Sequence, residues 1–193
     1  WYKYFGFFLV GAALDQLMVD IAKYTIGRKR PHFMAVCKPV YNESCTSPSV
    51  YITDYTCAGA AIYDADTIRE SSLSFYSGHS AFTFYCAVFL AIYMQGRLSR
   101  ALYTPLLLPI VQVALVAGAT YTAYSRVSDY KHHWSDVLVG IFLGTMFGVY
   151  TSVVAARVFH RRRIIYDLEQ AEAGAIKLQV NGQENGGYGT HRE

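Results

Sequence analysis

Hydrophobic residues are grouped along the chain into four long runs that are separated by polar stretches. The runs predict helices at about residues 4–26, 79–95, 101–124 and 137–159. A helix of about 20 mostly apolar residues is long enough to cross the hydrocarbon layer of a bilayer. The pattern therefore predicts an all-α fold, an integral membrane helical bundle with four spans.

Two polar segments complete the predicted layout. Residues 31–76 are rich in Pro, Ser and Thr, and the alternating run Ser49–Thr53 predicts a little strand, so we expect a folded extramembrane loop. Residues 164–193 are polar and rich in Gly and Asn, which predicts a disordered cytosolic tail. We therefore assign residues 1–163 to one membrane domain.

Composition supports a membrane protein. Hydrophobic residues make up 53% of the chain and charged residues only 16%, whereas charged residues reach about a quarter of an ordinary soluble domain. The net charge is only +3, and nothing in the sequence suggests nucleic acid as a partner. The expected surroundings are a bilayer. The sequence leaves the oligomeric state open, a homo-oligomer included.

The chain opens inside an apolar element. Residues 1–22 are hydrophobic apart from Lys3, Asp15, Gln16 and Asp20, and they show neither an initiator Met nor a signal-peptide pattern. We therefore expect a fragment of a longer membrane protein. Acidic residues in such a helix are expected to face protein or water rather than lipid.

The distribution of basic residues orients the predicted spans. Arginines lie in the short turn at 97–100 and in the run at 161–163, which four spans place on one face of the membrane. The positive-inside rule makes that face cytosolic. The loop at 31–76 and the segment 125–136 then face the lumen or the exterior, at the plasma membrane or an endomembrane. An N-glycosylation sequon at Asn42 fits this orientation.

Cysteines in the loop favour the same compartment. Cys37, Cys45 and Cys57 lie close together in the sequence. Three thiols cannot all pair internally, so we expect one disulfide with one cysteine left over, and the spacing does not identify the pair. No acidic or Cys/His cluster suggests a metal, and no cofactor is predicted.

The polar stretch richest in ionisable groups runs from Ser125 to Asp136. If Asp136 opens the following helix, His132 lies one turn earlier, and the i,i+4 relation lets the carboxylate reach a ring nitrogen of His132. Ser125 and Arg126 could then hold an oxyanion in front of the same ring. A solvated loop with a helix cap at Ser135 or Asp136 is the alternative interpretation.

Two shorter polar stretches lie at the ends of other apolar runs. Lys23 and Arg30 could face the same way if the first helix runs on, with Pro31 ending it soon after. Snorkelling cations at a helix end are the alternative. The tripeptide Ser-Gly-His at 77–79 begins the second predicted span, where free backbone N–H groups can bind an anion. An N-cap serine with a boundary histidine is the alternative there.

The predicted topology brings these three stretches to membrane ends on the same non-cytosolic face. Together their cations, hydroxyls, glycine amide and histidines would surround a tetrahedral oxyanion. The ten residues involved are, in chain order, Lys23, Arg30, Pro31, Ser77, Gly78, His79, Ser125, Arg126, His132 and Asp136.

In type, order and spacing these residues resemble the three motifs of the type 2 phosphatidic acid phosphatase superfamily, in its animal lipid phosphate phosphatase branch. The motifs are Lys, six residues, Arg-Pro; then Pro-Ser-Gly-His; then Ser-Arg, five residues, His, three residues, Asp. The resemblance runs from the chain start to about Arg163. Tyr76 stands where the general pattern has proline, as is usual in the animal branch. The family's first two membrane helices have no counterpart in this sequence.

The resemblance implies hydrolysis of phosphate monoesters on lipids such as phosphatidic acid, lysophosphatidic acid, sphingosine 1-phosphate and ceramide 1-phosphate. It implies that His132, oriented by Asp136, is a nucleophile that forms a phosphohistidine, and that His79 is the general acid and base. The family spacing selects His132 over the adjacent His133. The residues implied in phosphate binding are Lys23, Arg30, Ser77, Gly78 and Arg126, with Pro31 and Ser125 in support. A metal-independent reaction is implied.

Three other classes of protein stay open. A vanadate-dependent haloperoxidase uses a similar residue set, but those relatives are soluble. A non-hydrolysing member would bind lipid phosphates as a receptor-like or scaffolding membrane protein, although such members have usually lost catalytic residues that this chain keeps. A transporter would place its cations at a midplane cavity, whereas the cations of this chain lie at span ends.

Overall fold

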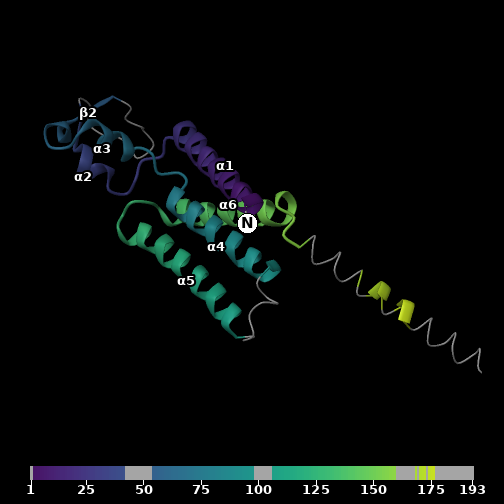
Figure 1. Cartoon of the computed structure of the whole chain (residues 1–193). Coiled ribbons are helices and arrows are strands. Elements are labelled where there is room, and N and C mark those ends of the chain that lie inside the picture. Colours follow the sequence, from purple (N-terminus) through teal and green to yellow (C-terminus); the bar gives the residue numbers. More distant parts are fainter. Residues whose placement is uncertain are drawn as a thin grey trace, which may run out of the picture.

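The structure, a computed structural model, describes residues 2–41, 54–97 and 106–159, with residue 168 and the short stretches 170–172 and 174–176. Long helices dominate it (Figure 1): α1 (Tyr2–Ile26), α4 (Gly78–Arg97), α5 (Leu107–Ser128) and α6 (Trp134–Val149), which continues as the π-helical η2 (Tyr150–Ala155). The predicted all-α membrane bundle is confirmed.

A smaller folded region lies between α1 and α4 in the sequence and beyond one end of the long helices in space (Figure 1). Its elements are α2 (Phe33–Cys37), β1 (Pro39–Tyr41), β2 (Tyr55–Cys57), η1 (Ala58–Ala61) and α3 (Ala65–Glu70). The two strands pair antiparallel, and the disulfide between Cys37 and Cys57 closes the hairpin beside them. The expected disulfide therefore joins the first and third cysteines of the loop.

Several predictions fall outside the described residues. They concern the glycosylation site Asn42, the remaining loop cysteine Cys45, the strand at Ser49–Thr53, the first residues of the span at 101–124 and most of the tail at 164–193.

Within the residues that the structure describes, three helical segments are long and apolar enough to cross a membrane, namely Tyr2–Ile26, Leu107–Ser128 and Trp134–Ala155. Helix α4 has 20 residues but is not among them, and it packs against α1, α5 and α6. Because part of the α4 surface packs against three other helices, less of it faces lipid, and it needs fewer apolar side chains than a more exposed span. The chain is an integral membrane protein. Of the four predicted spans, three have the length and apolar composition of a membrane-crossing helix.

Glycines on α6 bring its backbone against that of α4. A side chain at Gly140 would place its Cβ 2.6 Å from the carbonyl oxygen of Ser77, and one at Gly144 would overlap the carbonyl of Ala81. Small residues spaced four apart allow two membrane helices to approach this closely. The contact fixes the first turn of α4 against the first turns of α6.

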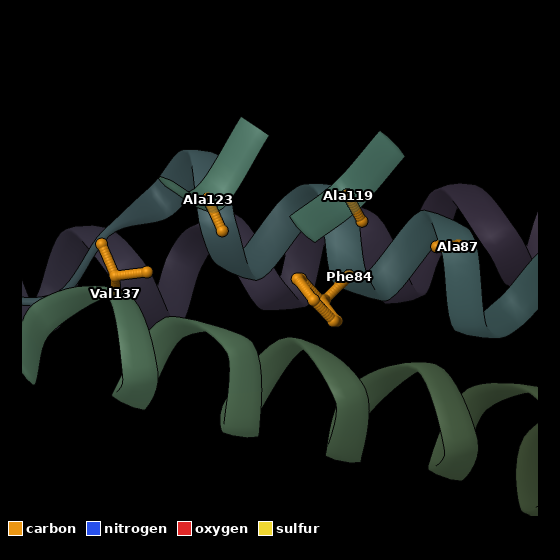
Figure 2. Close-up of a cluster of buried hydrophobic side chains, with 5 residues drawn as sticks. All are labelled: Phe84, Ala87, Ala119, Ala123 and Val137. Carbon is orange, nitrogen blue, oxygen red and sulfur yellow. The ribbon is translucent and has the colours of Figure 1, made fainter. Parts of the chain in front are cut away.

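An apolar cluster holds α5 on the other side of α4 (Figure 2). Phe84 and Ala87 of α4 pack with Ala119 and Ala123 of α5 and with Val137 of α6. The alanines leave room for the Phe84 ring between the helices. As a result, the end of α5 and the beginning of α6 are both held beside α4.

Helix α1 ends at Ile26, where the predicted span ends, and does not run on towards Arg30. Gly27 adopts a left-handed φ of +59°, and its N–H donates to the carbonyl of Lys23 at 3.0 Å. Glycine in this conformation is a common way to end a helix. The condition under which Lys23 and Arg30 would share a helix face is therefore not met.

Helices α5 and α6 also have boundaries that differ from those predicted. Helix α5 continues to Ser128, so Ser125 and Arg126 lie within its last turn. Helix α6 begins at Trp134 with His133 as its N-cap residue, so neither residue named in the alternative interpretation, Ser135 or Asp136, is the N-cap, although the Asp136 side chain takes part in a capping box. The regular helical structure of the last span ends at residue 155 rather than 159.

Candidate active site

Backbone hydrogen bonds bring the three motifs together at one end of the bundle. The N–H of Ser77 donates to the carbonyl of Asp136 at 3.1 Å, which joins the second motif to the third. The N–H of Ser74 donates to the carbonyl of Arg28 at 2.8 Å, which joins the segment before α4 to the segment after α1. The convergence predicted from topology is therefore present.

His132 lies in the turn between α5 and α6 and is only 4% exposed. Its backbone N–H donates to the carbonyl of Arg126 at 3.1 Å, which returns the chain towards α4. Its ring Nδ1 lies 2.7 Å from the carbonyl oxygen of Ser74. Because a carbonyl oxygen only accepts, the proton of the neutral ring is on Nδ1, and Nε2 keeps its lone pair.

The surroundings of His132 keep its imidazole neutral. Burial lowers the pKa of His132 to about 4, and the positive charges of Arg30 and Lys23 act in the same direction. The Ser74 carbonyl and the Asp136 carboxylate oppose this shift but do not cancel it. At neutral pH the Nε2 atom is therefore available as a nucleophile.

Asp136 does not make the predicted hydrogen bond to a ring nitrogen of His132. Its buried carboxylate accepts from the Ser74 hydroxyl at 2.5 Å and from the His133 N–H at 3.2 Å, and it pairs with the Arg28 guanidinium. The prediction is wrong because His132 precedes the N-cap, where helical i,i+4 geometry does not apply. The carboxylate instead caps the helix in which it lies.

A cavity of about 360 Å³ lies between α1 and α4. It is lined by Gln16 and Lys23 of α1 and by Gly78, His79 and Phe82 of α4. A Cβ placed on Gly78 would lie 3.7 Å from Nζ of Lys23, so the ammonium group and the glycine backbone are neighbours. The cavity thus joins the first two motifs, with the exposed His79 on its wall.

Arg30 reaches the site although it lies beyond the end of α1. Its N–H donates to the carbonyl of Ser71 at 2.9 Å, and its Nε donates to the carbonyl of Leu73 at 3.2 Å. These bonds hold the arginine against the segment that precedes α4. Its charge acts on the rings of both His79 and His132.

Arg126 is held at the end of α5. Its Nη2 donates to the hydroxyl of Ser125 and to the carboxylate of Asp129, each at 3.1 Å. The positive charges of Arg126, Lys23 and Arg30 all act on the ring of His79. The histidine of the second motif therefore lies within the electrostatic reach of cations from the first and third motifs.

Ser77 and Pro31 have mainly structural surroundings. The buried hydroxyl of Ser77 accepts from the Ser80 hydroxyl at 2.9 Å and from the Ser80 N–H at 3.4 Å, as an N-cap does. The N-cap interpretation of this serine is therefore observed. Pro31 lies in the turn that leads from Arg30 into α2.

Comparison with known proteins assigns the chain to a family. The model of the PAP2 superfamily matches residues 4–160. The chain belongs to the PAP2 superfamily. The resemblance based on the three motifs is thereby confirmed.

The PAP2 chain is similar to named proteins over most of its length. Phospholipid phosphatase 1 of Rattus norvegicus is 48% identical over 148 residues, which are 77% of this chain and 50% of the relative. Phospholipid phosphatase 2 of Homo sapiens is 46% identical over 172 residues, 89% of this chain and 57% of the relative. This chain therefore spans about half the length of the curated relatives it matches. No solved structure matches it.

Two residues of this PAP2 site were missed from the sequence. Arg28 contacts Asp136, and Ser74 contacts both Asp136 and His132. The only sequence signal for Arg28 is its place in the basic run 28–30. Ser74 has no such signal, because its contact with His132 is made by a backbone carbonyl.

Proposed function

We propose that this PAP2 protein is a metal-independent phosphatase acting on lipid phosphate monoesters. The proposed substrate class comprises phosphatidic acid, lysophosphatidic acid, sphingosine 1-phosphate and ceramide 1-phosphate. The observation that carries the proposal is the buried, neutral His132, whose free Nε2 belongs to the same cluster as the cations beside His79. The printed names of the relatives, phospholipid phosphatases 1 and 2, support a lipid substrate.

In the first step Nε2 of His132 attacks phosphorus, and the bond from phosphorus to the lipid oxygen breaks. The ring keeps its proton on Nδ1, which donates a hydrogen bond to the Ser74 carbonyl, and the ring becomes a positively charged phosphohistidine. His79 donates a proton to the departing lipid alkoxide, so a neutral alcohol leaves. The exposed ring of His79, on the wall of the cavity, suits this exchange of protons.

In the second step His79, now neutral, takes a proton from water as the water oxygen attacks the phosphorus. The bond from phosphorus to nitrogen breaks, inorganic phosphate leaves, and His132 regains its lone pair. Lys23, Arg30 and Arg126 balance the negative charge on the equatorial oxygens in both transition states. The Gly78 backbone lets a phosphate approach the beginning of α4.

Access from the bilayer fits the position of the cavity. Helix α1 contributes Gln16 and Lys23 to it, and α4 contributes Phe82, which is 39% exposed. A lipid lying between these two helices would place its phosphate beside Lys23 and its apolar part along Phe82. The proposed face of the membrane is extracellular or lumenal, where the positive-inside rule places the ends of the helices that form the site.

The test is release of phosphate from radiolabelled phosphatidic acid in detergent micelles by the purified full-length protein. We expect the wild type to release phosphate and His132→Ala to release none. The label should appear on wild-type protein after rapid quenching under conditions that preserve phosphohistidine. Binding of labelled lipid without any phosphate release would refute the phosphatase and identify the non-hydrolysing alternative.

A further inference from the structure

We infer that Ser74 and Arg28 are positioning residues for His132, and that Asp136 acts on the nucleophile through Ser74. The hydrogen-bonded series runs from the Arg28 guanidinium to the Asp136 carboxylate, then to the Ser74 hydroxyl and, through the Ser74 carbonyl, to the His132 ring. This inference rests on the proposed function, because it concerns the rate at which His132 accepts phosphate.

Ser74 forms hydrogen bonds with three residues of the site, Arg28, Asp136 and His132. Its N–H donates to the Arg28 carbonyl at 2.8 Å, its hydroxyl donates to Asp136 at 2.5 Å, and its carbonyl accepts from His132 at 2.7 Å. The residue is fully buried. With its N–H and its side chain both anchored, the Cα of Ser74 is held in place, which restricts where its carbonyl oxygen, the acceptor for the His132 ring, can lie.

Arg28 supplies the positive charge that the buried Asp136 needs. Its Nη1 contacts the carboxylate and also donates to the Ser135 hydroxyl at 2.8 Å. The Asp136 carboxylate has no exposed surface, and burying a charged carboxylate without a charged partner costs free energy of folding. Arg28 lies between Lys23 and Arg30 in the sequence, but its guanidinium contacts a carboxylate that has no exposed surface.

Loss of the contact between Ser74 and His132 should slow the transfer of phosphate to His132 without weakening phosphate binding. If the Ser74 carbonyl moves, the ring of His132 can turn, or its proton can shift to Nε2. After either change the Nε2 lone pair no longer points at the phosphorus atom. The phosphate oxygens are bound by other residues, so affinity for phosphate should not change. A misplacement of about 1 Å at a reacting group can cost about 100-fold in rate.

The test compares Ser74→Ala and Arg28→Gln with Ser72→Ala and Lys29→Gln. The control pair also carries a hydrogen bond, from Lys29 Nζ to Ser72 Oγ at 3.0 Å, but on the exposed side of the same segments. The measurements are the burst rate with p-nitrophenyl phosphate and the inhibition constant of inorganic phosphate. We expect each test variant to lose about 10- to 100-fold in burst rate with an unchanged inhibition constant, and each control to match wild type.

Two further variants separate positioning from general stability. Ser74→Thr keeps the hydroxyl and should restore most of the burst rate. The double variant Ser74→Ala, Arg28→Gln should lose less than the product of the single losses, because both act along one path. Should Ser74→Ala fail to fold, Arg28→Lys carries the test, with an intermediate loss expected because it keeps the charge.

Failure of the inference differs from failure of the proposed function. If wild type forms no phosphohistidine, the proposed function is wrong. If wild type forms it but Ser74→Ala and Arg28→Gln behave like the controls, or if their losses multiply fully, the positioning role is wrong. Weaker inhibition by phosphate in these variants would also contradict it, since that result would place the residues in phosphate binding.

Discussion

His132 and Ser74 are separated by 58 positions in the sequence, yet the histidine Nδ1 donates to the serine carbonyl at 2.7 Å. The bond crosses from the turn before α6 to the segment before α4. It selects one tautomer of the ring and leaves Nε2 unprotonated. The chemistry predicted for this protein depends on that choice.

The first prediction concerns pH. Because the pKa of His132 is lowered to about 4, the ring loses its nucleophilic lone pair only when the pH falls towards that value. The burst rate with p-nitrophenyl phosphate, which needs no acid for its leaving group, should therefore stay constant from neutral pH down to about pH 5. Rapid-quench measurements across this range test it. A tenfold fall in burst rate around pH 6.5, the ordinary pKa of histidine, would contradict the buried neutral ring.

The second prediction separates the two histidines. His132→Ala removes the covalent step and should abolish turnover of every phosphate ester. His79→Ala should lose about 100- to 10,000-fold with a lipid substrate, whose alkoxide needs a proton. With p-nitrophenyl phosphate the same variant should still give a burst of nitrophenol followed by slow turnover, since water is no longer activated.

The decisive measurement is a rapid burst assay on both variants with a quench that preserves phosphohistidine. Equal losses of His79→Ala on both substrates would show that it is not a leaving-group acid. A burst from His132→Ala would show that another residue is the nucleophile, and the neighbouring His133 would be the first residue to mutate.

The third prediction is independence from metal ions. Lys23, Arg30 and Arg126 are proposed to balance the phosphate charge that divalent ions balance in metal-dependent phosphatases. Among the residues that the structure describes, no group of three or more His, Cys, Asp or Glu side chains could hold a metal ion. Phosphate release in excess EDTA should stay within about twofold of the untreated rate. Activity lost to EDTA and restored by magnesium would overturn this mechanism.

The fourth prediction concerns the contact between α4 and α6. Gly144→Ala would push a methyl group into the Ala81 carbonyl, separate the two helices and displace Ser77 from Asp136. We expect a loss of about 1–3 kcal/mol in stability, as for an overpacked core, together with lower activity. Thermal unfolding in detergent and phosphate release measure the two effects.

Gly118→Ala in α5 is the matched control for Gly144→Ala. A Cβ at Gly118 would meet no atom within 4 Å, and the residue lies within a helix. Alanine should therefore be neutral or stabilising there, by up to about 1 kcal/mol. If both variants destabilise the protein equally, the close contact of α4 with α6 is not what makes Gly144 necessary.

The fifth prediction concerns orientation in the membrane. If the loop at 31–76 faces the lumen or the exterior, Asn42 should carry a glycan in a eukaryotic host. Digestion with an N-glycosidase and the Asn42→Gln variant should produce the same increase in gel mobility. Protease digestion of the loop in sealed microsomes, whose cytosolic face is outward, would place it in the cytosol and refute the topology.

Much of the fold can be predicted from the sequence because the membrane restricts the choices. Long apolar runs must form helices that satisfy their own backbone groups, so the bundle follows from hydropathy alone. The positions of Lys23, His79 and His132 at helix ends follow from where those runs stop. The motif spacing, in turn, led to the family.

Only the tertiary structure decided how the motif residues are held. Arg30 would have shared a face with Lys23 had α1 run on, but the helix ends at Ile26, and the arginine is held by the carbonyls of Ser71 and Leu73. Asp136 was expected on His132 but is bonded to Ser74. These relations depend on backbone carbonyls and on the close packing of α4 against α6. Every residue has a carbonyl, so no side-chain pattern in the sequence could mark which one would orient the histidine.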